Sequence, residues 1–185
     1  NHRKLIVADE MVKPKDPSAG LKMVTIITSA NPHDGSSAHG NVALEVRDAL
    51  WKSVVVAEGS VAKLSDLEIP GYMKENVRDE EGDVLVTLLR ERSIKQKVLD
   101  ILNGINKGDR LEMAMFYLSD RDIIKALSDA SYRGADIRII LDPNKDAFGF
   151  EKNGIPNRPV AGELTRRSVG DIKFRWCDTH GEQCH

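Results

Sequence analysis

The stretch Asn1-His2-Arg3-Lys4-Leu5-Ile6-Val7-Ala8-Asp9 places a histidine and a lysine two residues apart, directly before a short apolar run. Residues i and i+2 of a β-strand lie on the same face, so the pattern predicts that His2 and Lys4 point into one site. A neutral imidazole can act as a nucleophile, and a neighbouring ammonium can bind the phosphate that it attacks. Leu5–Ala8 would be the buried strand that positions both side chains. The stretch therefore indicates phosphoryl chemistry at the start of the first strand.

Two further elements follow in order. The segment Lys22–Thr28 (KMVTIIT) is typical of a strand and runs directly into Ser29-Ala30-Asn31. The next strand-like segment, Asn41-Val42-Ala43-Leu44-Glu45-Val46, has the pattern N-x-x-x-E. Together with H-x-K-x-x-x-x-D over residues 2–9, this order resembles the phospholipase D superfamily, with Thr28 where that family more often has glycine. The resemblance covers nearly the whole chain.

Members of that superfamily carry two HxK motifs, one in each half of a pseudo-symmetric molecule. The last residue, His185, follows the strand-like segment 171–176 and stands where the histidine of the second motif would fall. The resemblance therefore implies a fragment that runs from the first motif to the start of the second. We expect an α/β, phospholipase D-like fold with mixed or parallel sheets flanked by helices, made of parts of two pseudo-symmetric lobes. Because each site needs both halves, we expect the fragment alone to be inactive.

The resemblance also implies a two-step reaction through a phosphohistidine. His2 would be the nucleophile and His185 the acid that protonates the leaving alcohol, although the two roles could be exchanged. The phosphate would be bound by Lys4, Ser29 and Asn31.

Two carboxylates complete the implied site. Glu45 would accept a hydrogen bond from the second nitrogen of the histidine and so fix its tautomer. Asp9 belongs to the motif, and we expect it to hydrogen-bond within the site rather than to react. No metal and no cofactor are implied, because lysines supply the positive charge.

The implied substrate is a phospholipid or another phosphodiester, reached at a membrane surface through the parent protein. Hydrolysis and transfer to an alcohol, as in cardiolipin synthases, differ only in the acceptor that attacks the phosphohistidine. A metal-independent nuclease of the same superfamily is an alternative, disfavoured by the net charge of −2, which gives no basic footprint for nucleic acid. A non-catalytic α/β module is the other alternative. The sequence assigns no compartment.

Composition adds few constraints. The chain has 185 residues, 41% hydrophobic and 30% charged, as in an ordinary globular protein. Its two cysteines are too few for a disulfide framework. Cys177, His180, Cys184 and His185 could bind zinc, but their spacing fits no common zinc finger, so a metal site is not favoured.

The pattern along the chain predicts two parts joined by a linker. Residues 1–66 would be the C-terminal part of the first lobe, ending in a helix over 48–64 with an apolar stripe at helical spacing. Residues 67–83 contain Pro70-Gly71 and a charged run, which favours a linker. Residues 84–185 would be the N-terminal part of the second lobe.

The second part alternates strand and helix patterns. This part starts at 84–88. Strands are expected at 111–118, 136–142 and 171–176, with helices near 94–105 and 119–133, the last ended by Gly134. Such alternation favours parallel βαβ units. Residues 149–167 contain two prolines and little periodicity, and predict a long surface excursion. Splitting each lobe would expose sheet edges, through which a fragment could form a homodimer.

Overall fold

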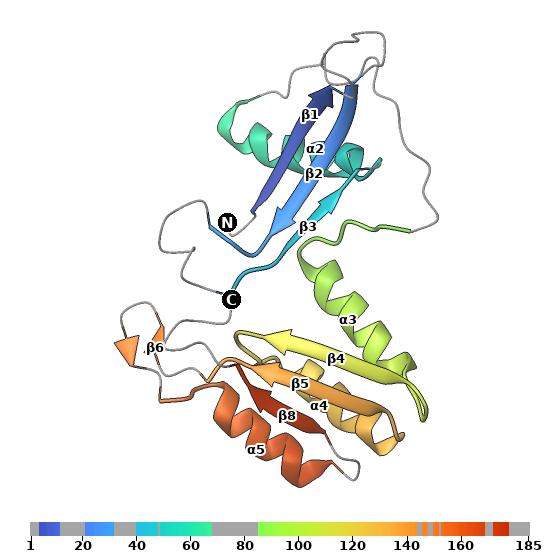
Figure 1. Cartoon of the computed structure of the whole chain (residues 1–185), viewed down its shortest axis with the longest axis vertical. Coiled ribbons are helices and arrows are strands. Elements are labelled where there is room, and N and C mark those ends of the chain that lie inside the picture. The colour runs from blue at the N-terminus through green and yellow to red at the C-terminus, as the bar shows by residue number, and fades with distance from the viewer. Residues whose placement is uncertain are drawn as a thin grey trace. The chain divides into compact units, whose positions relative to one another are not determined.

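The computed structural model describes residues 4–11, 21–31, 40–47, 49–67, 85–143, 146–147, 150–151, 153–168 and 172–177. The chain divides into two compact units, residues 1–31 with 42–88 and residues 32–41 with 89–185. Each unit has its own small sheet and its own helices (Figure 1). The predicted α/β class with mixed sheets is thus confirmed. None of the helices in the described ranges is long and apolar enough to span a membrane.

The first unit is an antiparallel sheet with one helix against it. Its elements are β1 (Leu5–Met11), β2 (Leu21–Thr28), β3 (Ala43–Val46), α2 (Leu50–Ala62) and the short 3₁₀ helix η2 (Lys63–Ser65). The strands lie in the order β1-β2-β3, with Leu5 opposite Ile27 and Ile27 opposite Leu44. The three strands and the helix stand where the sequence predicts them, with ends that differ by a few residues.

The core of the first unit lies between one sheet face and α2. Val46 of β3 and the helix residues Leu50 and Val54 are buried together. Leu5, Val7 and Ile27 pack against them from β1 and β2, so α2 covers the face to which these alternating side chains point. Trp51 of α2 is also buried.

The second unit is a parallel sheet with helical crossovers. Its elements are α3 (Arg92–Gly104), β4 (Arg110–Met115), α4 (Arg121–Tyr132), β5 (Asp136–Leu141), the hairpin β6 (Asp146–Ala147) and β7 (Phe150–Glu151), α5 (Asn157–Arg167) and β8 (Lys173–Trp176). The strand order is β4-β5-β8, and both pairings are parallel. The expected parallel βαβ arrangement is confirmed in this unit.

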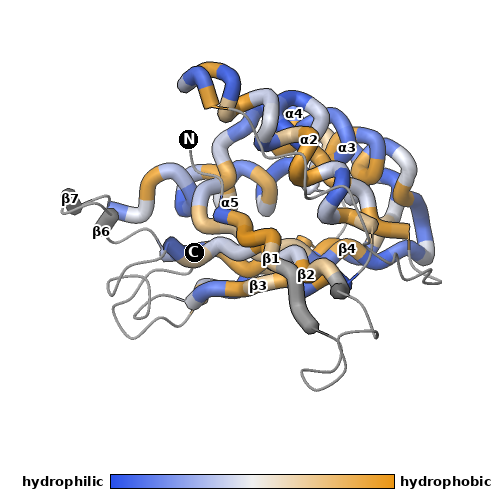
Figure 2. The backbone as a smooth tube through the Cα atoms, turned by 90° about the horizontal axis from the view of Figure 1, so that it is seen from above, coloured by the Kyte–Doolittle hydropathy of each residue, from blue (hydrophilic) through white to orange (hydrophobic). Residues whose placement is uncertain are grey.

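One face of this parallel sheet forms the larger core. Along β5, Ile137, Ile139 and Leu141 are buried while Arg138 and Ile140 between them are exposed. The buried set joins side chains of α3, α4 and α5 in a single cluster. Apolar and polar residues recur at helical spacing in these helices. Orange and blue segments therefore follow one another along α3 and α4 (Figure 2).

The segment 85–88, with which the second part was expected to start, forms no strand, and Val86 and Leu88 pack against the core of the first unit. Their alternating apolar pattern is explained by the partial burial of these two side chains, and it does not require a strand.

The predicted surface excursion contains α5. Val160, Ala161 and Leu164 form a short buried stripe on this helix. Pro159 lies in its first turn, where the missing N–H removes no intrahelical hydrogen bond, so this proline does not prevent the helix.

Gly134 ends α4 with a positive backbone angle (φ +91°), as the sequence predicts. We expect Gly134→Ala to lower the free energy of unfolding by about 1–2 kcal/mol, because a side chain is disfavoured in the left-handed region. An added Cβ would also lie 3.3 Å from the Cβ of Lys107. Urea denaturation measures the effect. Gly104→Ala is the matched control, because its Cβ would meet no atom within 4 Å; an equal loss there would contradict the argument.

Candidate functional site

The predicted site begins on the sheet face of the first unit that points away from α2. Residues directly opposite one another on antiparallel strands share a face. Lys4 lies opposite Thr28, whose N–H donates to the carbonyl of Lys4 at 3.0 Å. Glu45 lies opposite Ile26, which in turn pairs with Ile6, next to Leu5 on β1. Because Leu5 points towards α2, Lys4 and Glu45 share the opposite face.

The ends of the strands bring further predicted residues to one edge of this sheet. Since β1, β2 and β3 are antiparallel, the start of β1, the end of β2 and the start of β3 meet at that edge (Figure 1). Lys4 stands before β1, and Ser29 and Asn31 follow β2. All three are partly buried. The structure therefore brings together the described residues that the resemblance assigns to phosphate binding.

Two hydroxyls at this edge have a structural role that the sequence did not predict. The Thr28 hydroxyl donates to the carbonyl of Val42 at 3.1 Å and accepts from the N–H of Ala30 at 3.0 Å. The Ser29 hydroxyl accepts from the N–H of Val42 at 3.0 Å. These bonds join the end of β2 to the residue before β3.

Glu45 pairs with a cation that directly follows its own strand, β3. The Arg47 Nε lies 2.8 Å from Glu45 Oε1, and both side chains are about half exposed. Arg47 is two residues further along, on the same face of the strand. The pair positions a carboxylate on the face that Lys4 shares.

Three of the predicted site residues cannot be placed. His2 and His185 lie outside the described residues, and the side chain of Asp9 in β1 is not described. Their assigned roles stay predictions.

In the second unit, a buried asparagine joins the carboxyl ends of two parallel strands. Asn157, the first residue of α5, has no exposed surface. Its Oδ1 accepts from the N–H of Leu118 at 2.8 Å, and its Nδ2 donates to the carbonyls of Phe116 and Asp142 at 2.8 and 2.9 Å. These partners follow β4 and β5 directly. Asn157 therefore fixes the edge of the sheet at which ligands of open α/β sheets usually bind.

The same edge carries a buried carboxyl group and a tyrosine. Asp142 is 2% exposed and directly follows β5. Partial burial, and then the charge of Asp142, raise the pKa of the Tyr117 phenol above its ordinary value. The Tyr117 ring lies 4.2 Å from that of Phe116. The chain leaves β8 beside these groups, because the N–H of Cys177 donates to the carbonyl of Leu141 at 2.9 Å.

Comparison with known families finds a match in this second unit. A family model described as cardiolipin synthase, PLD-like domain, matches residues 101–185. This match supports the phospholipase D superfamily that the sequence motifs resemble. Nothing among the curated proteins, and nothing among the solved structures, matches the chain. The match to the phospholipase D-like domain does not include residues 1–100, in which His2, Lys4, Ser29, Asn31 and Glu45 lie.

The state of Cys177 bears on the alternative zinc site in the tail. Cys177 is disulfide-bonded. A cysteine ligand of zinc must be a free thiolate, which a disulfide sulfur is not. The described ranges hold no cluster of three metal-ligating side chains.

Sequence reasoning missed the role of Asn157. It stands between Pro156 and Pro159 in a segment without a long periodic pattern, where an asparagine is ordinarily a turn residue. Its partners Phe116, Leu118 and Asp142 are distant in sequence. The short stripe of Val160, Ala161 and Leu164 was the signal that could have placed it at the start of a helix.

Proposed function

We propose that this chain forms part of a phosphodiesterase or phosphatidyltransferase that acts on phospholipid phosphodiesters through a phosphohistidine. The phospholipase D-like domain at 101–185 supports the superfamily and a phosphodiester-related role. The observation that carries the finer proposal is the shared sheet face of Lys4 and Glu45, with Asn31 after the adjacent strand. His2 extends the same i, i+2 pattern from Lys4 by sequence.

In the first step, the His2 imidazole attacks phosphorus, and the bond from phosphorus to the leaving alcohol breaks. The leaving oxygen takes a proton from His185. Lys4 and Asn31 would bind the non-bridging oxygens, on which negative charge accumulates in the transition state. Glu45, held by Arg47, would accept a hydrogen bond from the other nitrogen of the nucleophilic imidazole.

In the second step, an acceptor attacks the phosphohistidine. His185, now neutral, removes the proton of water or of an alcohol as the oxygen bonds to phosphorus, and the phosphorus–nitrogen bond breaks. Water gives hydrolysis, whereas a lipid alcohol gives phosphatidyl transfer. Both outcomes use the same residues, so the acceptor that reaches the site decides between them.

Mass spectrometry of the full-length protein tests the proposal. We expect a covalent adduct on His2 after a short reaction with a phosphatidylglycerol substrate, quenched at alkaline pH because phosphoramidates are labile in acid. An adduct on His185 would exchange the two histidine roles. Absence of any histidine adduct while turnover is observed would contradict the mechanism. An adduct formed from an oligonucleotide and not from the lipid would favour the nuclease alternative.

A further inference from the structure

The parallel sheet of the second unit has a second, highly charged face. Opposite the helices, it carries side chains that lie next to one another across the three strands. They are Arg110, Glu112, Asp136, Arg138, Lys173 and Arg175. Four are cations and two are carboxylates, so positive charge is in excess on this face.

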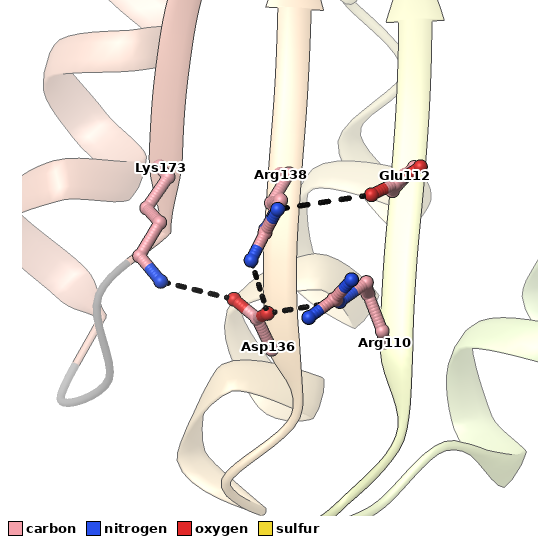
Figure 3. A network of polar contacts seen from close by, with 5 residues as sticks. All are labelled: Arg110, Glu112, Asp136, Arg138 and Lys173. Carbon is pink, nitrogen blue, oxygen red and sulfur yellow. Dashed lines mark hydrogen bonds and ion pairs between the residues drawn. The ribbon is translucent and has the colours of Figure 1, made fainter.

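Three of the cations converge on one carboxylate (Figure 3). Asp136 Oδ2 lies 3.2 Å from Arg110 Nε and 3.1 Å from Arg138 Nη2, and its Oδ1 lies 3.2 Å from Lys173 Nζ. Lys173, and then Arg138, hold the pKa of Asp136 below its ordinary value. One negative charge is therefore shared among three positive charges.

A groove of about 500 Å³ lies over this face. Arg138, Lys173 and Arg175 contribute cations to its lining, and Glu112 the one carboxylate. Glu112 is only loosely paired, with its Oε1 3.9 Å from Arg138 Nη1. The guanidinium of Arg175 donates to the carbonyl of Phe174, and no carboxylate in the described part of the chain pairs with it.

We propose that this groove binds a small organic phosphate, with the phosphate beside Arg138, Lys173 and Arg175 and the carbon skeleton over Ala114 and Ile140. Guanidinium and ammonium groups form strong charge-assisted hydrogen bonds with phosphate oxygens. The volume lies within the range of small-molecule pockets.

A membrane surface is a less suitable occupant of the groove. Peripheral membrane sites insert large apolar side chains next to their cations. Among the side chains that line the groove, Ile140 is the one exposed large hydrophobic residue, at 45%. The proposal involves neither His2 nor His185, so it is independent of the proposed catalytic function.

Isothermal titration of the full chain with glycerol 3-phosphate tests the proposal. We expect saturable, salt-sensitive binding that Arg175→Gln weakens roughly tenfold, because it removes a charge-assisted contact. Glu112→Gln is expected to tighten binding roughly two- to fivefold, since it removes the carboxylate that lines the groove and repels the phosphate. Lys125 is an exposed residue of α4. Lys125→Gln is the matched control for loss of a positive charge and should leave the affinity unchanged.

Two further measurements test whether the phosphate binds at another site and whether the ligand is a lipid headgroup. Loss of binding in Lys4→Gln together with unchanged binding in Arg175→Gln would place the phosphate at the motif in the first unit and overturn the groove. Vesicles containing phosphatidylglycerol provide the lipid arm. Binding to vesicles without binding of glycerol 3-phosphate would overturn the proposal, and so would equal losses in Arg175→Gln and Lys125→Gln.

Discussion

Replacing His2 with alanine in the full-length protein is expected to lower phosphodiester turnover by roughly 10⁴-fold or more, the scale seen when a nucleophile is removed. The phosphohistidine intermediate cannot form without the imidazole, while Lys4 and Asn31 would still bind phosphate. We therefore expect the loss in kcat, with a much smaller change in substrate affinity. Steady-state kinetics on a phosphatidylglycerol substrate, with equilibrium binding to the same vesicles, separates the two effects.

A second histidine, His33, provides the control. His33→Ala removes an imidazole to which we assign no chemistry, and should retain nearly full turnover. Added imidazole should restore part of the activity of His2→Ala, because it can supply the missing nucleophile in solution. Turnover within tenfold of the parent protein in His2→Ala would show that His2 is not the nucleophile.

The elements that were predicted correctly each show their pattern within one short segment of the sequence. Ile137, Ile139 and Leu141 alternate with exposed residues in β5, so both the strand and its buried face follow from residues 136–141 alone. The end of α4 was likewise predicted from one residue. Glycine is favoured where a helix ends with a positive φ, and Gly134 has such an angle.

The features that were missed depend on distant partners. Val86 and Leu88 alternate as in a strand, yet the residues that bury them come from β3 and α2. In α5, two prolines obscured a buried stripe of three apolar residues that is meaningful only against the core of α4 and β5.

The candidate site likewise has one feature that follows from a single segment and others that depend on distant partners. The spacing of His2 and Lys4 is a local pattern, and it could be interpreted without a structure. That Glu45 shares a face with Lys4 depends on the register of three strands, which the sequence does not specify over loops of this length. The hydroxyl contacts of Thr28 and Ser29 with Val42 likewise required that register.

The second large effect is expected at Asn157. Asn157→Ala should lower the free energy of unfolding of the second unit by about 3–5 kcal/mol, because it leaves the buried N–H of Leu118 and the carbonyls of Phe116 and Asp142 without these partners. Urea denaturation followed by tryptophan fluorescence measures the change. A Trp51→Phe background restricts the signal to Trp176 in β8, and so to the second unit. Asn103→Ala, on the exposed surface of α3, should change stability by less than about 0.5 kcal/mol.

Asn157→Asp separates the hydrogen bonds of Asn157 from its volume. The aspartate keeps the shape and the acceptor towards Leu118, but it turns an oxygen towards the carbonyls of Phe116 and Asp142. Burial beside these oxygens should raise its folded-state pKa above the unfolded value of about 3.9. The variant should therefore be destabilised above that unfolded value and recover stability as the pH falls towards it, because the protonated carboxyl can again donate one hydrogen bond. Asn157→Ala should show no such recovery relative to the parent chain. Equal pH profiles for the two variants would mean that Asn157 acts by filling space rather than by joining the ends of β4 and β5.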